Sequence, residues 1–113
     1  MALRVIDEII GVGERLNRAC RQIAQHDREL GSQIRRAWVR ACMNAGEAQH
    51  RRGAKGRNRF DDAMGEAREA YTGLRMARAF AYADEGLLAG LIGEVDGVVA
   101  VLFTLAHKGR ASP

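Results

Sequence analysis

The sequence predicts an all-α protein, and more narrowly an antiparallel up-down-up-down four-helix bundle. The single proline, Pro113, stands at the end of the 113 residues, where it interrupts no helix, and aromatic residues make up only 5% of the chain. Apolar residues also recur at steps of three and four in four separate segments, which is the spacing of a buried helix face. Short connections between four long helices favour this topology.

The first helix is expected over about residues 3–23, and the second from residue 28 to about residues 50–52. Asp27 precedes the second helix, and aspartate is a favoured N-cap because its carboxylate accepts hydrogen bonds from free backbone N–H groups. The apolar stripe predicted for the first helix consists of Leu3, Ile6, Ile9, Ile10, Gly13, Leu16, Cys20 and Ile23. The stripe predicted for the second consists of Leu30, Ile34, Ala37, Trp38, Ala41, Cys42, Ala45 and Ala48.

A turn is expected between the second and third helices, over the stretch from Arg52 to Gly56. Its glycines disfavour a helix there. The third helix then runs to about Tyr82. Its predicted buried face consists of Phe60, Met64, Ala67, Tyr71, Leu74, Ala77 and Ala81.

The fourth helix is expected to begin after a cap at Asp84 and to carry an unusually wide apolar stripe. A stripe wider than one core needs predicts a subunit interface. Four glycines in this helix would weaken it, so either a close approach of another helix compensates for them or the helix is simply weak. The stripe consists of Leu88, Leu91, Ile92, Val95, Val98, Val99, Leu102, Phe103 and Leu105, and the glycines are Gly86, Gly90, Gly93 and Gly97.

One domain is expected, with the bundle over residues 1–107 and a disordered tail over residues 108–113. Cys20 and Cys42 fall among apolar positions without a Cys-x-x-Cys spacing, and are expected to be small, reduced core residues. The N-terminus lacks the apolar run of a signal peptide, and no window is expected to reach transmembrane length. We therefore expect a cytoplasmic protein that makes no membrane contact.

A local excess of positive charge marks the middle of the chain. Basic residues outnumber acidic ones by 18 to 14, and between Arg28 and Arg59 nine basic residues are opposed only by Glu29 and Glu47. Arginine suits phosphate, because its planar fork donates two parallel hydrogen bonds. We therefore predict a surface that follows a nucleic-acid backbone without reading bases. Its residues are Arg35, Arg36, Arg40, Arg51, Arg52, Lys55, Arg57 and Arg59.

Two other interpretations of these segments stay open. The arginines would have a purely structural role if they paired with the acidic residues of the third helix, leaving a protein-interaction scaffold that uses the fourth helix. Glu47 and His50 have the E-x-x-H spacing of carboxylate-bridged di-iron bundles, which would make the chain a metal-dependent oxidoreductase. No second copy of that spacing is present, and no segment has a catalytic signature, so neither a metal, a cofactor nor an enzymatic activity is expected. The acidic residues concerned are Asp61, Asp62, Glu66 and Glu69.

The second and third helices also carry a set of motifs in a fixed order. Gln33-Ile34-Arg35-Arg36-Ala37, followed by Asn44-Ala45-Gly46-Glu47, resembles the second helix of the four-helix bundle proteins first found encoded within intervening sequences of bacterial large-subunit ribosomal RNA genes. Arg59-Phe60, then Ala63-Met64-Gly65 and Glu69, are similar to the third helix of that family. The resemblance extends over most of residues 3–106.

This resemblance implies a homopentameric ring without catalytic activity. In the related accessory (Avd-like) proteins of diversity-generating retroelements, it implies a basic outer surface that binds nucleic acid and a reverse transcriptase. The chain departs from the family pattern where Trp38 replaces a small residue, where Arg40-Ala41-Cys42 replaces Ser-Ile-Pro, and where Ala48 replaces glycine. These departures leave the bundle intact but place the ancestral function in question.

Overall fold

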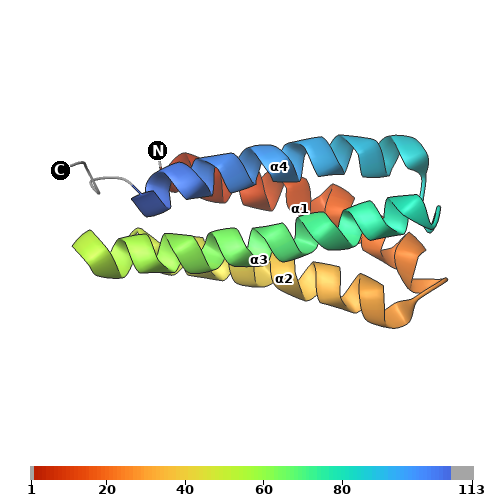
Figure 1. Cartoon of the computed structure of the whole chain (residues 1–113), viewed down its shortest axis with the longest axis horizontal. Helices are drawn as coiled ribbons and strands as arrows, with labels where there is room; N and C mark the ends of the chain where they lie inside the picture. The colour runs from red at the N-terminus through yellow and green to blue at the C-terminus, as the bar shows by residue number, and fades with distance from the viewer. Residues whose placement is uncertain (1, 108–113) are drawn as a thin grey trace.

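The computed structural model describes residues 2–107, and the side chains of residues 4–107. Four helices follow one another: α1 (Ala2–Ala24), α2 (Arg28–Ala48), α3 (Gly53–Ala79) and α4 (Glu85–His107). Each runs antiparallel to the one before, which confirms the predicted up-down-up-down bundle (Figure 1). The α2–α3 turn lies at the same end as the start of α1 and the end of α4. The tail predicted over residues 108–113 lies outside the described residues.

Aspartate caps fix the starts of two helices, as the sequence predicts. The Oδ1 atom of Asp27 accepts a hydrogen bond from the backbone N–H of Leu30 at 2.9 Å, and Oδ2 of Asp84 accepts one from Leu87 at 2.8 Å. Both bonds satisfy N–H groups that have no partner within the first helical turn. The backbone N–H of Asp84 also donates to Oε1 of Gln22 at 2.8 Å, which ties the α3–α4 connection to α1.

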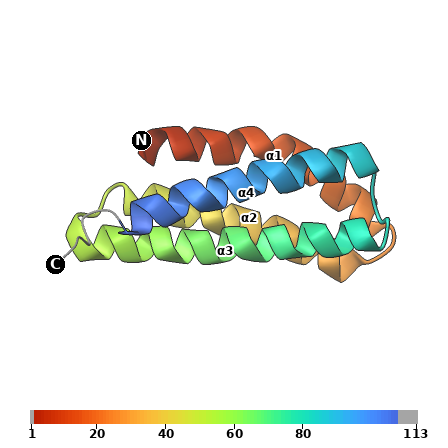
Figure 2. The ribbon, with the colours of Figure 1, turned by 45° about the horizontal axis from the view of Figure 1, so that its top comes forward.

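The buried faces of α2 and α3 consist largely of small side chains, whereas α1 and α4 bury mostly larger ones. Helices α2 and α3 lie side by side along their length, as do α3 and α4 (Figures 1 and 2). Trp38 is the largest buried side chain of α2, and its Nε1–H donates to the backbone carbonyl of Ile9 in α1 at 2.9 Å. The buried alanines of α2 and α3 are Ala37, Ala41, Ala45, Ala48, Ala63, Ala67, Ala70 and Ala77.

The buried face of α1 differs from the predicted one. Val5, Val12 and Ala19 are buried with Ile9, whereas Ile10 is 62% exposed. The prediction for Ile10 was therefore wrong. Apolar residues lie on two sides of this helix, and periodicity within one helix cannot decide which side its partners cover. Leu16, Cys20 and Ile23 are buried as predicted, Ile6 and Gly13 are partly buried, and the side chain of Leu3 is outside the described part.

The third helix begins earlier and ends earlier than expected. It starts at Gly53, whose φ of +60° suits glycine, so the predicted Arg52–Gly56 turn is wrong and the connection from α2 is only residues 49–52. A Cβ atom on Gly56 would lie 2.7 Å from the carbonyl oxygen of Arg51. The glycine therefore permits a tight helix start. At the other end, Ala81 is exposed in the following turn with φ of +57°, so its predicted burial was also wrong.

The fourth helix is apolar on more faces than the bundle covers. Leu88, Leu91 and Val95 are buried, while Ile92 and Val99 are only partly buried and Phe103 is 48% exposed. By length and composition α4 is the one helix of the described chain that could cross a membrane, and 28% of that window is buried. This contradicts the expectation that no window has transmembrane length, although a core helix of a bundle has the same composition.

Candidate nucleic-acid interface

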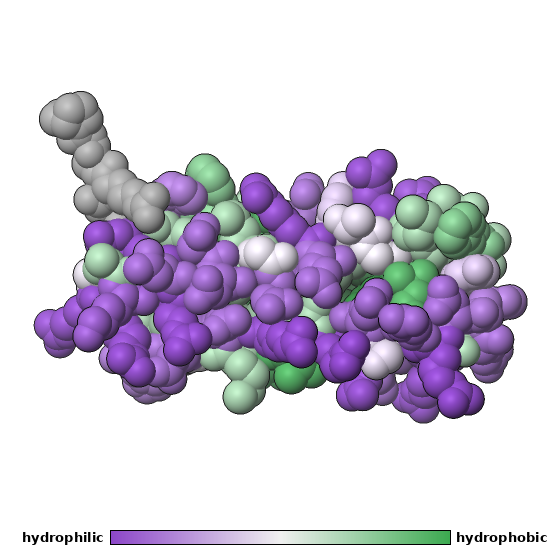
Figure 3. All heavy atoms as spheres, turned by 60° about the horizontal axis from the view of Figure 1, so that its bottom comes forward, coloured by the Kyte–Doolittle hydropathy of each residue, from purple (hydrophilic) through white to green (hydrophobic). Residues whose placement is uncertain are grey.

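The predicted arginines of α2 lie on its outer side. Arg35, Arg36 and Arg40 are exposed, while Ala37 and Trp38 between them are buried. Residues four apart in a helix are neighbours on its surface, which places Arg36 and Arg40 one turn apart along the same exposed line. Viewed from the side of α2 and α3, the surface is largely hydrophilic, with scattered apolar residues (Figure 3). Burial of the apolar side of α2 thus fixes the orientation of the helix and keeps these arginines on its exposed side.

The remaining predicted residues gather where α2 ends and α3 begins. Arg51, Arg52, Lys55 and Arg59 are exposed, and Arg57 is half-buried. A shallow pocket of about 200 Å³ opens here between Arg51, Lys55, Asn58, Arg59 and Asp62. Three of those five lining side chains are cationic, so the pocket favours an anion. The eight predicted residues, referred to below as the basic face, therefore lie on α2, the turn and the first two turns of α3.

Two short-range contacts order part of the basic face. Arg51 donates to Oε1 of Glu47 from Nη2 at 2.6 Å and from Nε at 3.0 Å. These hydrogen bonds, together with the positive charge, lower the pKa of Glu47. Arg59 donates from Nη1 to Oδ1 of Asn44 at 3.0 Å, which joins α3 to α2. Asn44 thus takes part in a polar bond between two helices.

The acidic residues of α3 form no ion pair with the basic face in the described chain, although Asp62 lines the pocket beside Arg51, Lys55 and Arg59. Within residues 4–107 the ion pairs join Arg15 to Glu94, Arg51 to Glu47, and Arg78 to Glu85. None of them connects a residue of the basic face to the four carboxylates of the structural alternative, which are Asp61, Asp62, Glu66 and Glu69. The Nε atom of Arg57 and Oε1 of Glu66 are each buried without a hydrogen-bond partner.

The alternative metal pair is not assembled in the described chain. Glu47 is occupied by Arg51, and His50 lies exposed beyond the end of α2. No group of three His, Cys, Asp or Glu side chains in the described part is placed to hold a metal ion. The arrangement around Glu47 and His50 offers a single carboxylate that already accepts two hydrogen bonds from an arginine.

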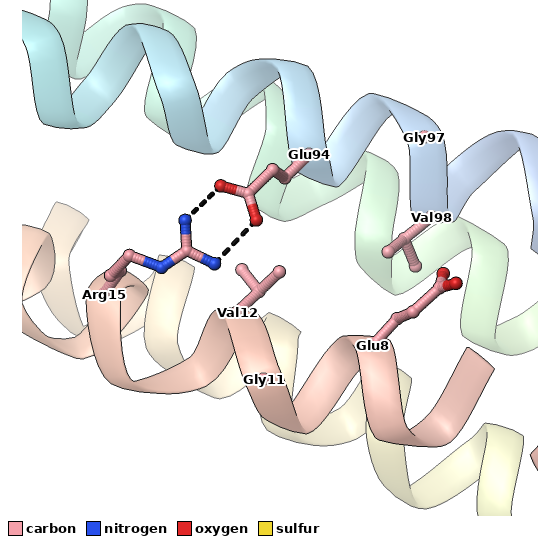
Figure 4. Close-up of a pocket in the computed structure, with 7 residues that line it drawn as sticks. All are labelled: Glu8, Gly11, Val12, Arg15, Glu94, Gly97 and Val98. Carbon is pink, nitrogen blue, oxygen red and sulfur yellow. Dashed lines mark hydrogen bonds and ion pairs between the residues drawn. The ribbon is translucent and has the colours of Figure 1, made fainter. Parts of the chain in front are cut away.

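A larger cavity lies away from the basic face, between α1 and α4, and the sequence did not reveal it. It measures about 430 Å³ and runs from Glu8, past Gly11 and Gly97, to the side chains of Arg15 and Glu94 (Figure 4). Arg15 and Glu94 form a two-pronged ion pair across the helices, and Nη2 of Arg15 lies 2.6 Å from Oε2 of Glu94. This hydrogen bond raises the pKa of Arg15. The sequence does not show that α1 packs beside α4, so it could not predict a cavity between these two helices.

Comparison with known proteins supports the fold and leaves the function open. No family model matches the chain, and no curated protein is similar enough in sequence to be matched. A solved structure from Bacteroides thetaiotaomicron, a protein of unknown function from the S23 ribosomal protein family, has a similar fold with a TM-score of 0.80. The similarity covers 90% of this chain and 97% of that one, at 18% sequence identity. This chain therefore shares the helical fold of that protein.

Proposed function

We propose that this protein is a non-enzymatic, self-assembling binding protein whose basic face takes the phosphate backbone of RNA or DNA without base specificity. The observation that carries the proposal is the lack of ion pairs on most of that face. Of its eight residues only Arg51 is in an ion pair within the described chain, although four carboxylates stand on α3. Exposed guanidinium groups without acidic partners are free to replace the counterions of a polyanion.

The chemistry of the face favours backbone contact over base recognition. Arginine forks match phosphate oxygens, and such contacts fix position on a strand without reading its sequence. Stacking on bases would need exposed aromatic side chains. Trp38 and Phe60, the aromatic residues nearest the basic face in the sequence, are 4% and 7% exposed and are used by the core. Binding is therefore expected to depend strongly on salt and weakly on sequence.

The test reverses charge at Arg36 and Arg40, which are exposed and form no ion pair in the described chain. We expect the Arg36→Glu, Arg40→Glu variant to bind an oligonucleotide at least about tenfold more weakly at low salt. The slope of log affinity against log salt should fall by about 2, because each arginine removed takes one phosphate interaction with it. Fluorescence anisotropy across a salt series measures both quantities.

The matched control is Arg68→Glu, Arg75→Glu, which makes the same change in net charge on exposed positions of α3 outside the basic face. Circular dichroism establishes that both variants fold. Equal weakening in the two variants would mean that net charge alone drives binding, and unchanged binding in Arg36→Glu, Arg40→Glu would remove the assigned surface.

Self-assembly is proposed from the uncovered apolar surface of α4. Phe103 is 48% exposed, Val99 lies one turn away on the same side, and Gly90, Gly93 and Gly97 have no neighbour within 4 Å of a Cβ atom. The close helix approach proposed for those glycines is thus absent within the described chain; Gly97 lines the cavity between α1 and α4, and Gly90 and Gly93 are open to another copy. The α2 and α3 motifs resemble those of the ribosomal RNA intervening-sequence family, and this resemblance implies that the assembly is a homopentameric ring.

Light scattering on nuclease-treated protein tests the assembly. The wild type is expected at about five times the 12.4 kDa chain mass. Phe103→Glu should reduce the mass towards that of one chain, because a carboxylate would be buried in the interface without a partner. Met76→Glu, at a 47% exposed position of α3, is the control and should keep the full mass. A monomeric wild type would contradict this part of the proposal.

A nucleoprotein is the proposed form of the partner in the cell. The resemblance to retroelement accessory proteins makes a reverse transcriptase the candidate, and such an enzyme would be held near its template by a ring that binds nucleic-acid backbone. A cytoplasmic location fits the two free cysteines, since thiols persist in a reducing compartment.

A further inference from the structure

A second basic pocket lies between α1 and α2, towards the end opposite the α2–α3 turn. It measures about 190 Å³, and its walls carry three guanidinium groups: Arg21 from α1, and Arg28 and Arg35 from α2. Arg28 and Arg35 are seven residues apart, which is about two helical turns, so they project from the same side of α2. Ser32 lies between them and Asn17 stands opposite on α1. Only Arg35 belongs to the basic face.

The backbones of the two helices come close at this pocket. A Cβ atom on Gly31 would lie 2.8 Å from the carbonyl oxygen of Cys20, so the contact between α1 and α2 is made there without a side chain. The close approach draws arginines of two helices around one opening. Arg28 is also the first residue of α2, next to the capping residue Asp27.

The residues that line this pocket include no acidic side chain. None of the three arginines takes part in an ion pair within residues 4–107. Cys20 also lines it, and burial raises the pKa of this thiol to about 11 even though Arg35 acts to lower it, so the group is neutral at physiological pH. The pocket therefore presents three positive charges with hydroxyl and amide groups beside them, which an oxyanion would stabilise.

We propose that this pocket binds a phosphate group carrying two negative charges, either free phosphate or a terminal phosphate monoester. Three guanidinium forks surround the phosphate oxygens, with the Ser32 hydroxyl as a further donor. The volume is below the roughly 300–1,000 Å³ of pockets that enclose whole drug-sized ligands, so it suits the phosphate rather than a complete nucleotide. Backbone binding by the basic face does not require this site.

Titration of inorganic phosphate into the full chain, followed by the amide NMR signals of the protein, tests the site. At constant ionic strength and a pH of about 8, where phosphate is a dianion, the signals of Asn17, Gly31 and Ser32 are expected to shift and saturate. Arg21→Gln should weaken phosphate binding by about tenfold or more, because it removes a charge and a fork. Arg68→Gln, which changes an exposed arginine of α3 outside the pocket, should leave the affinity unchanged.

The Arg35→Lys variant distinguishes two explanations of phosphate binding, a pocket with specific hydrogen bonds and a general attraction to positive charge. Lysine keeps the charge but lacks the fork, so weaker phosphate binding in this variant supports the site. Shifts that do not saturate, full affinity in Arg35→Lys, or equal losses in Arg21→Gln and Arg68→Gln would each overturn the proposal.

The source of the phosphate is resolved with oligonucleotides. A 5′-phosphorylated strand that binds more tightly than its 5′-hydroxyl form, with the gain lost in Arg21→Gln, assigns the site to strand ends. Equal binding of the two forms, together with saturable phosphate binding, assigns it to free phosphate. Because Arg21 is outside the basic face, binding of the 5′-hydroxyl strand should be the same in Arg21→Gln and wild type, so this test and that of the basic face fail independently.

Discussion

Replacing Trp38 with alanine is expected to lower the free energy of unfolding by about 3–5 kcal/mol, the usual cost of removing a large buried aromatic side chain. The indole is 4% exposed and stands where α2 meets α1, with its Nε1–H donating to the carbonyl of Ile9 at 2.9 Å. Alanine would leave a cavity that the neighbouring side chains fill only in part. Chemical denaturation monitored by circular dichroism measures the decrease in stability.

Trp38→Phe isolates the hydrogen bond from the packing. This variant keeps most of the aromatic volume and removes the bond to Ile9, and is expected to cost about 1–3 kcal/mol. Val39→Ala is the matched control, because Val39 is the next residue and is 52% exposed, and it should change stability by no more than about 0.5 kcal/mol. A Trp38→Ala variant as stable as Val39→Ala would show that the indole is not the contact joining α1 to α2.

Substituting alanine for two glycines of α3 is expected to have opposite effects. Gly56→Ala should destabilise the protein by about 1–3 kcal/mol. Its Cβ atom would lie 2.7 Å from the carbonyl oxygen of Arg51 and 3.2 Å from that of Ala48, and both are backbone atoms that cannot rotate away. Gly65→Ala meets nothing within 4 Å and should stabilise the helix by about 0.5–1 kcal/mol.

The two glycine variants are best compared as a pair by thermal and chemical unfolding. The change in helix propensity is the same in both, so the difference between them reports the contact of α3 with the end of α2. Equal stability of the two variants would contradict the tight turn. Because Arg51 and Arg52 lie in that turn, Gly56→Ala is also expected to weaken nucleic-acid binding, which Gly65→Ala should not do.

The sequence predicted the number, order and caps of the helices because those depend on local chemistry. Asp27 and Asp84 precede apolar periodic segments, and each carboxylate makes its capping bond. The face of α2 was predicted correctly, since Ile34, Trp38 and Ala41 lie on one side with charged residues opposite. In α1 apolar residues stand on both sides, and only the positions of α2 and α4 decide that Ile10 is outside.

The predicted turn over Arg52–Gly56 was wrong because glycine has two uses that look alike in a sequence. It disfavours helix through its conformational freedom, and it permits close contact through its lack of a side chain. At Gly56 the second use decides the structure, since the first turn of α3 packs directly on the backbone that ends α2. A sequence pattern cannot distinguish these cases before the packing is known.

The sequence predicted which residue types make up the candidate site, and the structure was needed to show whether they are paired with carboxylates. Local charge was the reason for choosing the eight residues of the basic face, but whether Asp61 or Glu69 would pair with them depended on distances that the sequence does not give. The pocket around Arg21 could not be predicted, because that residue is separated from Arg28 in the sequence by a helix end and a connection. Its only sequence signal is the seven-residue spacing of Arg28 and Arg35.

The buried alanines of α2 and α3 have an electrostatic consequence. Helix axes lie about 8–10 Å apart depending on the side chains at the contact, and small buried side chains favour the short end of that range. These alanines are almost fully buried, and the cations of the basic face stand on the exposed sides of the same two helices. Uncharged residues therefore help to set the charge density of the surface, because larger buried side chains would spread the same arginines over a wider area and weaken the local potential.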